Sequence, residues 1–338
     1  MALVPLQTIF QGAFPAYEQT HPLPAHVRRA ARAIMQCRTA VLGGHVPACP
    51  DGHMARLWDN SCRHRACPPC AYRQTERWLA RQQARLLACD HSHVIFTLPH
   101  DRNPLWLAHV PILSTLLFQA ARATLCTLLG APTYLGAQPG LSVALHTWSQ
   151  PLVLHPPLHG LVTGGGLSAE GRWVAVRHGF LLPVRVVMAV FRGKRLGALR
   201  HAFVPDALVL PEAMRPQQFL HRLTRLGHAQ KTPWHVHMRE RYRHGAGVVP
   251  SRARSLRGGP SKHARLVAWD GERVTLTSHP RAEAPASGGP SRTRMTLASA
   301  AFLPRWLRHV PAPQTRVVRS YGLDHHLHAV AVARCRAP

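Results

Sequence analysis

Cysteine and histidine side chains gather in one short segment of the chain, with a spacing typical of a zinc site. Cys67 and Cys70 are two residues apart, so their thiolates share one tight turn. Cys49 and His53, further upstream, supply a second pair and complete the four ligands that a tetrahedral zinc ion takes. Cys62 competes for one of these places. The sequence therefore predicts a zinc module in which Cys49/His53 and Cys67/Cys70 are the favoured pairs.

Other side chains in the same segment allow a second zinc ion. The candidate ligands are Cys37, His45 and His64. Cys89, Cys126 and Cys335 are isolated, and we expect them to be buried or incidental. Because no basic residue precedes Arg28, we expect no secretory signal and a cytoplasmic location. In that compartment, cysteines indicate metal binding rather than disulfides.

A basic helix is predicted directly after the zinc segment, over Ala71–Ala88. Its arginines recur every four residues and so form one stripe. They are Arg73, Arg77, Arg81 and Arg85. The whole chain has 42 Lys and Arg against 14 Asp and Glu, a net charge of +28, so a polyanion is the expected partner. We interpret the stripe as a reader of the DNA backbone, with a merely solvated arginine face as the alternative.

Acidic residues are too sparse for several kinds of hydrolytic chemistry. None lies between Asp101 and Glu170. Transposases with three catalytic carboxylates and glycosidases need such clusters, so both classes are disfavoured. Asp206, Glu212 and Glu240 remain as a weak cluster. Hydrophobic residues make up 46% of the chain, which excludes a disordered basic tail.

The hydrophobic pattern predicts an α+β protein with an N-terminal zinc module and an antiparallel sheet with helices. Strands are expected over His93–Leu98, over Trp234–Met238 and twice within Leu141–Val162, the second of these over Leu152–Val162. A hairpin is expected over 264–277, because Asp270-Gly271 suits a type I′ turn. Helices are expected over Leu105–Leu129, Pro183–Phe203, Glu212–Gly227 and Met295–Val310. Gly164-Gly165-Gly166 is expected to end a strand. The predicted domains are 1–90, 91–310 and a tail, 311–338.

Two histidines, His155 and His159, fall in one of the predicted strands. Histidines two residues apart on a strand share a face with their Cα atoms about 6.6 Å apart, so both rings can reach one divalent ion. An ion held in this way can polarise a phosphodiester for attack. His155 and His159 are four residues apart, which is about 13 Å on an extended strand.

The order of several motifs resembles the transposases of the insertion-sequence-ninety-one type, which are rolling-circle, HUH-type enzymes. The similarity extends over nearly the whole chain. The motifs are Asn60-Ser61-Cys62-Arg63-His64-Arg65, Phe96-Thr97-Leu98-Pro99, Trp148-Ser149-Gln150, His155-Pro156-Pro157-Leu158-His159, Leu161-Val162-Thr163-Gly164-Gly165-Gly166, Phe191-Arg192-Gly193-Lys194, Arg257-Gly258-Gly259-Pro260 and Tyr321-Gly322-Leu323.

This resemblance implies an activity and a cofactor. In that family the strand reads His-Pro-His-x-His, and its last two histidines hold a divalent metal, Mg or Mn, beside single-stranded DNA. One or two tyrosines attack the phosphate and form a 5′-phosphotyrosine, which exposes a 3′-hydroxyl for strand transfer. The implied architecture is a small antiparallel sheet with helices on one face, the central strands carrying the histidines.

The chain departs from the family pattern at the positions that carry the chemistry. Pro157 replaces the inner histidine, so His155 and His159 remain as the metal candidates, with His146 or Gln150 as substitute ligands. Ser251 and Ser255 occupy the positions of the two family tyrosines. Tyr242 and Tyr321 are the nearby phenols that could be recruited.

Three functions remain open at this point. The first is a transposase that nicks and joins single DNA strands. The second is a non-catalytic, zinc-dependent DNA-binding protein derived from such an enzyme, for which the replacements at 157, 251 and 255 argue. The third, an RNA-associated basic protein, accounts for the charge but not for the ordered motifs.

Overall fold

The computed structural model describes residues 4–47, 49–51, 53, 57–98, 103–149, 151–177, 181–203, 208–210, 214–228, 236–242, 265–278 and 293–325. The chain divides into two compact units. The first comprises Met1–Ala80, Trp148–Leu154 and Ala253–Thr315, and the second Arg81–Thr147, His155–Arg252 and Arg316–Pro338. Both combine helices with antiparallel strands, which confirms the predicted α+β class. The domain boundaries expected at residues 90 and 310 remain predictions.

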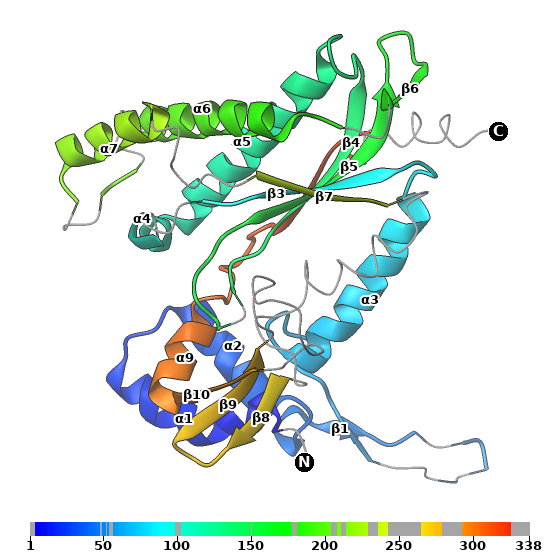
Figure 1. Ribbon diagram of the computed structural model, residues 1–338. Helices are drawn as coiled ribbons and strands as arrows, with labels where there is room; N and C mark the ends of the chain where they lie inside the picture. Colours follow the sequence, from blue (N-terminus) through cyan, green and yellow to red (C-terminus); the bar gives the residue numbers. More distant parts are fainter. Residues whose placement is uncertain are drawn as a thin grey trace. The chain divides into compact units, whose positions relative to one another are not determined.

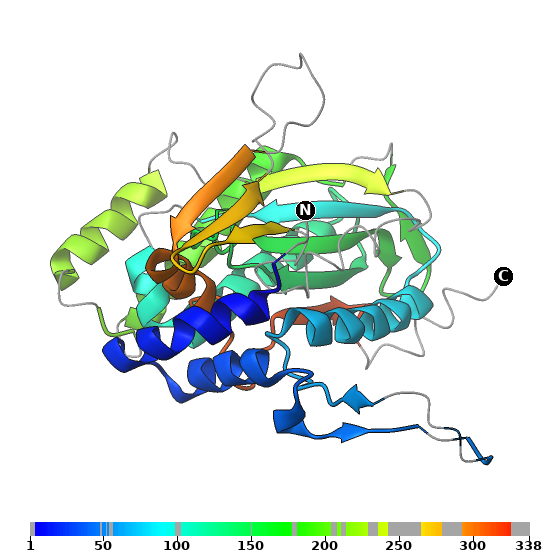
Figure 2. The ribbon, with the colours of Figure 1, turned by 90° about the horizontal axis from the view of Figure 1, so that it is seen from below.

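Three helices enclose the core of the first unit. They are α1 (Leu6–Thr20), α2 (Ala25–Gln36) and α9 (Ser299–Leu307). Phe10 of α1 lies edge-on to the ring of Trp306 of α9 at 5.0 Å and stacks on Phe14 at 5.9 Å. All three rings are fully buried, and α1 and α2 lie side by side (Figures 1 and 2). Aromatic side chains of this size contribute most of the buried apolar area of a small core.

A three-stranded antiparallel sheet completes this core. It consists of β8 (Leu266–Trp269), β9 (Arg273–Ser278) and β10 (Thr293–Ala298). The hairpin between β8 and β9 lies where it was predicted, but the type I′ turn at Asp270-Gly271 was wrong. Asp270 pairs with Arg273, so the two loop residues are Gly271, with φ +102°, and Glu272. The Asp270 carboxylate accepts hydrogen bonds from the backbone N–H groups of Glu272 and Arg273. The helix expected from Met295 is wrong over its first residues, because pairing with β9 keeps β10 extended as far as Ala298.

The cysteine-rich segment of the first unit contains little regular structure. After the short turn η1 (Ala40–Leu42), strands β1 (Gly44–His45) and β2 (Trp58–Asp59) pair as an antiparallel arm. Helix α3 (Pro68–Arg85) follows and confirms the predicted basic helix, beginning three residues earlier than expected. The Asn60 side-chain amide donates to the carbonyl of Leu42 at 3.1 Å, which ties the arm to the turn.

The second unit is built on a six-stranded antiparallel sheet. Its main path is β11-β4-β5-β3-β7, and β6 pairs with β5 at one side. The strands are β3 (His91–Phe96), β4 (Gln138–Leu145), β5 (Leu158–Leu167), β6 (Trp173–Ala175), β7 (Val236–Tyr242) and β11 (Val318–Gly322). Strands β5 and β3 lie at its centre, where the histidine-bearing strand was expected.

One face of this sheet is covered by helices. These are α5 (Val110–Gly130) and α6 (Val184–Phe203), with α4 (Asn103–Ala108) and α7 (Pro216–His228) nearby (Figure 1). Phe96 of β3 packs on Phe191 of α6 with ring centroids 4.6 Å apart. On β11, the Arg319 guanidinium lies 4.4 Å from the ring of Phe118 of α5. Residues with the same orientation on the neighbouring strands, such as Val143 and Val162, are fully buried.

Three predicted element boundaries are corrected in this unit. The helix expected over 105–129 is interrupted at His109, and Pro111 stands in the first turn of α5, where its missing N–H costs least. The strand expected from Leu152 begins only at Leu158. The three glycines do not end β5: a Cβ on Gly166 would lie 2.5 Å from the Gln138 carbonyl oxygen, so glycine allows β4 to approach.

Helix α5 is the one helix among the described residues whose length and composition would suit a membrane span. This is weak evidence, because core helices meet the same criteria. Leu117, Phe118, Ala121 and Leu125 of α5 are fully buried, in accord with its packing on β4, β5 and α6.

Candidate functional site

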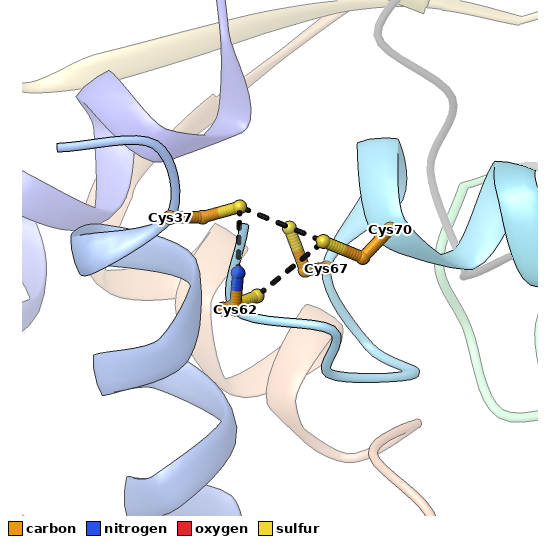
Figure 3. Close-up of side chains that lie close together, drawn as sticks. All are labelled: Cys37, Cys62, Cys67 and Cys70. Carbon is orange, nitrogen blue, oxygen red and sulfur yellow. Dashed lines mark hydrogen bonds between the residues drawn. The ribbon is translucent and has the colours of Figure 1, made fainter. Parts of the chain in front are cut away.

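Four cysteine thiols meet at one point in the first unit. They belong to Cys37, Cys62, Cys67 and Cys70, and all four sulfur atoms lie within 4.8 Å of one another (Figure 3). The Cys70 sulfur is 3.6 Å from that of Cys37 and 3.6 Å from that of Cys62. Around a tetrahedral zinc ion with Zn–S bonds of about 2.3 Å, the sulfur atoms are about 3.8 Å apart. The cluster therefore fits a structural zinc ion of the tetrathiolate type.

The local backbone explains how distant cysteines converge. Cys37 caps the C-terminus of α2, and its N–H donates to the Ile34 carbonyl. The chain then reverses at Arg38, whose φ is +58°. Cys67 closes a turn by donating from its N–H to the His64 carbonyl at 3.1 Å, directly before α3. Cys70 lies in the first turn of α3, so the Cys-x-x-Cys pair spans the beginning of that helix.

The thiols differ in their readiness to lose a proton. The hydrogen bond from Cys67 lowers the pKa of Cys62 to about 5. The pKa of Cys67 is raised, because its thiol donates the hydrogen bond to Cys62 and because it is buried. Burial raises the pKa of Cys37 to about 11. A cation is the natural partner of such a cluster, because a buried set of four thiolates needs compensating positive charge.

The fourth thiol of this cluster is Cys37, whereas the sequence spacing favoured Cys49 and His53. The structure does not bring Cys49 and His53 into the cluster. They form a separate, exposed group with Asp51, in which the Cys49 sulfur is 3.3 Å from His53 Nδ1. The sequence spacing pairs the Cys-x-x-Cys motif with the nearest upstream pair, whereas the thiol cluster includes the cysteine at the end of α2. The assignment of zinc to Cys49 and His53 stays a prediction.

The other two candidates for a second zinc ion make different contacts. His45 Nδ1 lies 3.2 Å from the Asn60 side-chain oxygen on the β1–β2 arm. His64 Nδ1 accepts from the Ala66 N–H at 3.1 Å, and burial lowers the pKa of the His64 ring.

The basic stripe lies on the solvent side of α3. Arg73, Arg77 and Arg81 are exposed, while Ala71 and Thr75 are buried on the opposite side. Arg85 ends the helix, but its side chain lies outside the described part. Tyr72 is 57% exposed next to Arg73 and was not singled out from the sequence. Successive residues of a helix lie about 100° apart around its axis, so Tyr72 presents its ring on a different flank of α3 from the arginine row. An exposed aromatic ring is a surface on which a nucleobase can stack.

Strand register in the second unit gathers histidines on one face. His159 pairs with Ile95 of β3 and with Ala144 of β4. His93 pairs with Leu161, two residues further along β5. Residues that are paired or two apart along a strand project from the same face, so His93 and His159 share the face opposite to α5 and α6. We call this the histidine face.

Two further histidine rings come close to His159 on this face. His93 Nε2 lies 3.2 Å from His159 Nδ1, and the two rings stack with centroids 5.3 Å apart. His146, directly after β4, has its ring centroid 5.6 Å from that of His159. His93 is almost fully buried, whereas His159 is partly exposed. Sequence reasoning named His146 as a substitute ligand but missed His93, although His93 begins the predicted strand and lies two residues from His91.

His155 and Pro157 lie in the segment that leads into β5. The His155 N–H donates to the Thr147 carbonyl at 3.0 Å, and the Pro157 carbonyl accepts from the His146 N–H at 3.1 Å. Pro157 is buried. The segment therefore continues along the end of β4, with His155 four residues before His159. Gln150, the other substitute ligand, lies outside the described residues.

The two candidate tyrosines in the described part of the chain lie on opposite faces of the sheet. Tyr321 pairs with Leu141 and lies beneath Arg122 of α5, 5.4 Å from the ring centroid, so it is on the face opposite to His159. Burial raises the pKa of Tyr321. Tyr242 pairs with His91 and belongs to the histidine face. Ser251 and Ser255 lie outside the described residues.

The chain thus contains both a thiol cluster and a histidine-bearing sheet, and comparison with known proteins agrees with this combination. The family described as "Transposase zinc-binding domain" matches residues 9–98, and the family described as "Putative transposase" matches residues 140–330. The chain belongs to the insertion-sequence-ninety-one type of transposases.

Two relatives of this family align with most of the chain. "Putative transposase y4qJ" of Sinorhizobium fredii is 34% identical over 332 residues, which cover 97% of this chain and 82% of the relative. "Transposase for insertion sequence element IS801" of Pseudomonas savastanoi pv. phaseolicola is 30% identical over 302 residues, covering 86% of this chain and 68% of the relative. No solved structure matches the chain.

Proposed function

We propose that this protein is a transposase that binds single-stranded ends of an insertion sequence and nicks and joins them at the histidine face. The observation that carries the proposal is the meeting of His93 and His159 on the central strands, 3.2 Å apart between ring nitrogens, in a chain of this family. The partner we propose is DNA, which locates the protein at the bacterial nucleoid in the cytoplasm.

The zinc module and α3 supply the binding energy in this proposal. A zinc ion held by Cys37, Cys62, Cys67 and Cys70 would crosslink the end of α2 to the beginning of α3. This fixes the direction of α3 and hence of its stripe. Arg73, Arg77 and Arg81 then pair with successive phosphates, and Tyr72 stacks on an exposed base of a single strand.

The histidine face supplies the site of chemistry. Imidazole nitrogens at this spacing fit a divalent ion, Mg²⁺ or Mn²⁺, which when bound would polarise the scissile phosphodiester and stabilise its charge. His93 is almost fully buried, and its ring stacks with that of His159. His159, which is partly exposed, faces the DNA.

The side chains at the family's nucleophile positions are poor nucleophiles. Serine hydroxyls at Ser251 and Ser255 are far less acidic than the phenols of the family, so either needs a base to attack a phosphate. Together with Pro157, these serines favour a second candidate function, a DNA-binding protein that occupies element ends without cutting them.

A covalent-capture experiment separates the two functions. The purified, zinc-loaded chain is incubated with single-stranded DNA from the ends of its element and Mn²⁺, and then analysed on a denaturing gel. A variant with Pro157→His, Ser251→Tyr and Ser255→Tyr is treated in parallel. An adduct from the unmodified chain supports the transposase, and mapping the adduct names the nucleophile. An adduct from the variant alone supports the non-cutting function on a sound scaffold. If neither forms an adduct, the proposed position of the active site is wrong.

A further inference from the structure

We infer that His93 of β3 takes the place of the histidine missing at position 157, so that one divalent cation is held between two neighbouring strands by His93 and His159. The inference rests on the proposed function, since it names a ligand of the same site. It differs from the sequence-based expectation, in which His155 and His159 of a single strand share the ion.

The distance between the two rings carries the argument. With metal–nitrogen bonds of about 2.0–2.1 Å, two imidazole nitrogens on one ion lie about 2.9–3.4 Å apart, depending on whether the angle at the metal is octahedral or tetrahedral. His93 Nε2 and His159 Nδ1 are 3.2 Å apart. The rings are nearly parallel, at 15°, with their centroids 5.3 Å apart. A hydrogen bond between the rings would produce the same spacing, and the experiment below distinguishes the two.

Strand geometry explains why position 93 can substitute for position 157. Neighbouring strands are about 4.8 Å apart, and His93 and His159 are diagonal neighbours on one face. His155, in contrast, is about 13 Å from His159 along an extended chain. The Pro157 carbonyl accepts a hydrogen bond from the His146 N–H. The segment before β5 therefore stays paired with the end of β4 although position 157 is not a histidine.

The surroundings of the pair indicate which ion it takes. His146 approaches His159 from the β4 side, at 5.6 Å between centroids. The His93–His159 pair offers imidazole donors, which favour first-row transition ions over Mg²⁺. His93 is 2% exposed, so an ion must enter past the partly exposed His159. We expect Mn²⁺ to bind more tightly than Mg²⁺.

Manganese binding without DNA tests this assignment. The zinc-loaded full chain is titrated with Mn²⁺, and free Mn²⁺ is followed by its electron paramagnetic resonance signal. We expect one tight site that His93→Ala and His159→Ala each weaken at least tenfold. His221→Ala, an exposed histidine on α7, is the matched control and should leave this site unchanged.

His93→Gln is a second variant that keeps a hydrogen-bonding side chain at this buried position. Thermal unfolding of each variant shows whether it is folded. His93→Gln should lose Mn²⁺ affinity as His93→Ala does. If the His93 variants fold and bind Mn²⁺ as the unmodified chain does, the inference is overturned. The covalent DNA adduct is measured separately, in the protein that carries Ser251→Tyr and Ser255→Tyr. If this adduct still forms when His93 is replaced, His93 is not a ligand of the ion, and the proposed function stands.

Discussion

Replacing Cys37 by serine tests which four residues form the zinc site. The Cys37 sulfur lies 3.6 Å from that of Cys70, while Cys49 belongs to a separate exposed group. Structural zinc contributes about 10–16 kcal/mol to small domains, so one of four thiolates accounts for roughly 3–4 kcal/mol. In a folding unit of about 150 residues, each kcal/mol shifts Tm by about 2–4 °C. We therefore expect Cys37→Ser to lower Tm by about 6–16 °C.

Zinc content and differential scanning calorimetry measure this effect. After desalting, the unmodified chain should retain the tightly bound zinc of the tetrathiolate cluster, and Cys37→Ser should release it to a mild chelator. Cys49→Ser is the matched control, because the same atom is exchanged in an exposed position. It should leave Tm within about 2 °C of the unmodified value. If Cys49→Ser releases the tight zinc and Cys37→Ser keeps it, the four-thiol cluster is refuted as the zinc site.

Three other predictions concern stability and DNA binding. Burial lowers the pKa of His309 from 6.5 to about 4. Between these two values the unfolded chain binds a proton at His309 that the folded chain does not. The free energy of unfolding is therefore highest above pH 6.5 and falls by about 3 kcal/mol as the pH is lowered to 4. Urea unfolding of His309→Gln should lack this part of the pH dependence, and an identical pH slope would contradict the assignment. Arg77→Ala should weaken DNA binding and reduce the slope of log K against log salt by about 1; an unchanged slope would show that Arg77 contacts no phosphate. Gly166→Ala should destabilise the protein by about 1–3 kcal/mol, because its Cβ would lie 2.5 Å from a backbone oxygen, whereas Gly197→Ala on α6, with open space around it, should be neutral or stabilising. Equal unfolding free energies for these two variants would show that β4 can move away.

Local chemistry made parts of the fold predictable from the sequence. The Asp270-Gly271 turn specifies its hairpin through its own side-chain and backbone preferences. Helix α3 follows from its periodicity, and so does the separation of Arg77 from the buried Thr75. These features depend on residues within one or two turns of each other, which a sequence pattern contains directly.

Features that depend on distant pairing could not be predicted in this way. The convergence of Cys37 with Cys70 brings together the end of α2 and the beginning of α3, which no spacing rule encodes. The approach of His93 to His159 joins positions 66 residues apart through strand register. The strand at Gly164–Gly166 was misjudged for a related reason, since glycine there serves close approach by β4 rather than chain reversal.

The central claim is that the histidine face is where a DNA strand is cut, and His159 tests it most directly. The measurement is nicking of a labelled single-stranded element end in Mn²⁺ by the Ser251→Tyr, Ser255→Tyr protein, with and without His159→Ala. The account predicts a nick with a 5′-phosphotyrosine adduct that His159→Ala reduces by at least a hundredfold, while DNA binding through α3 is retained. Equal nicking by the two proteins would contradict it.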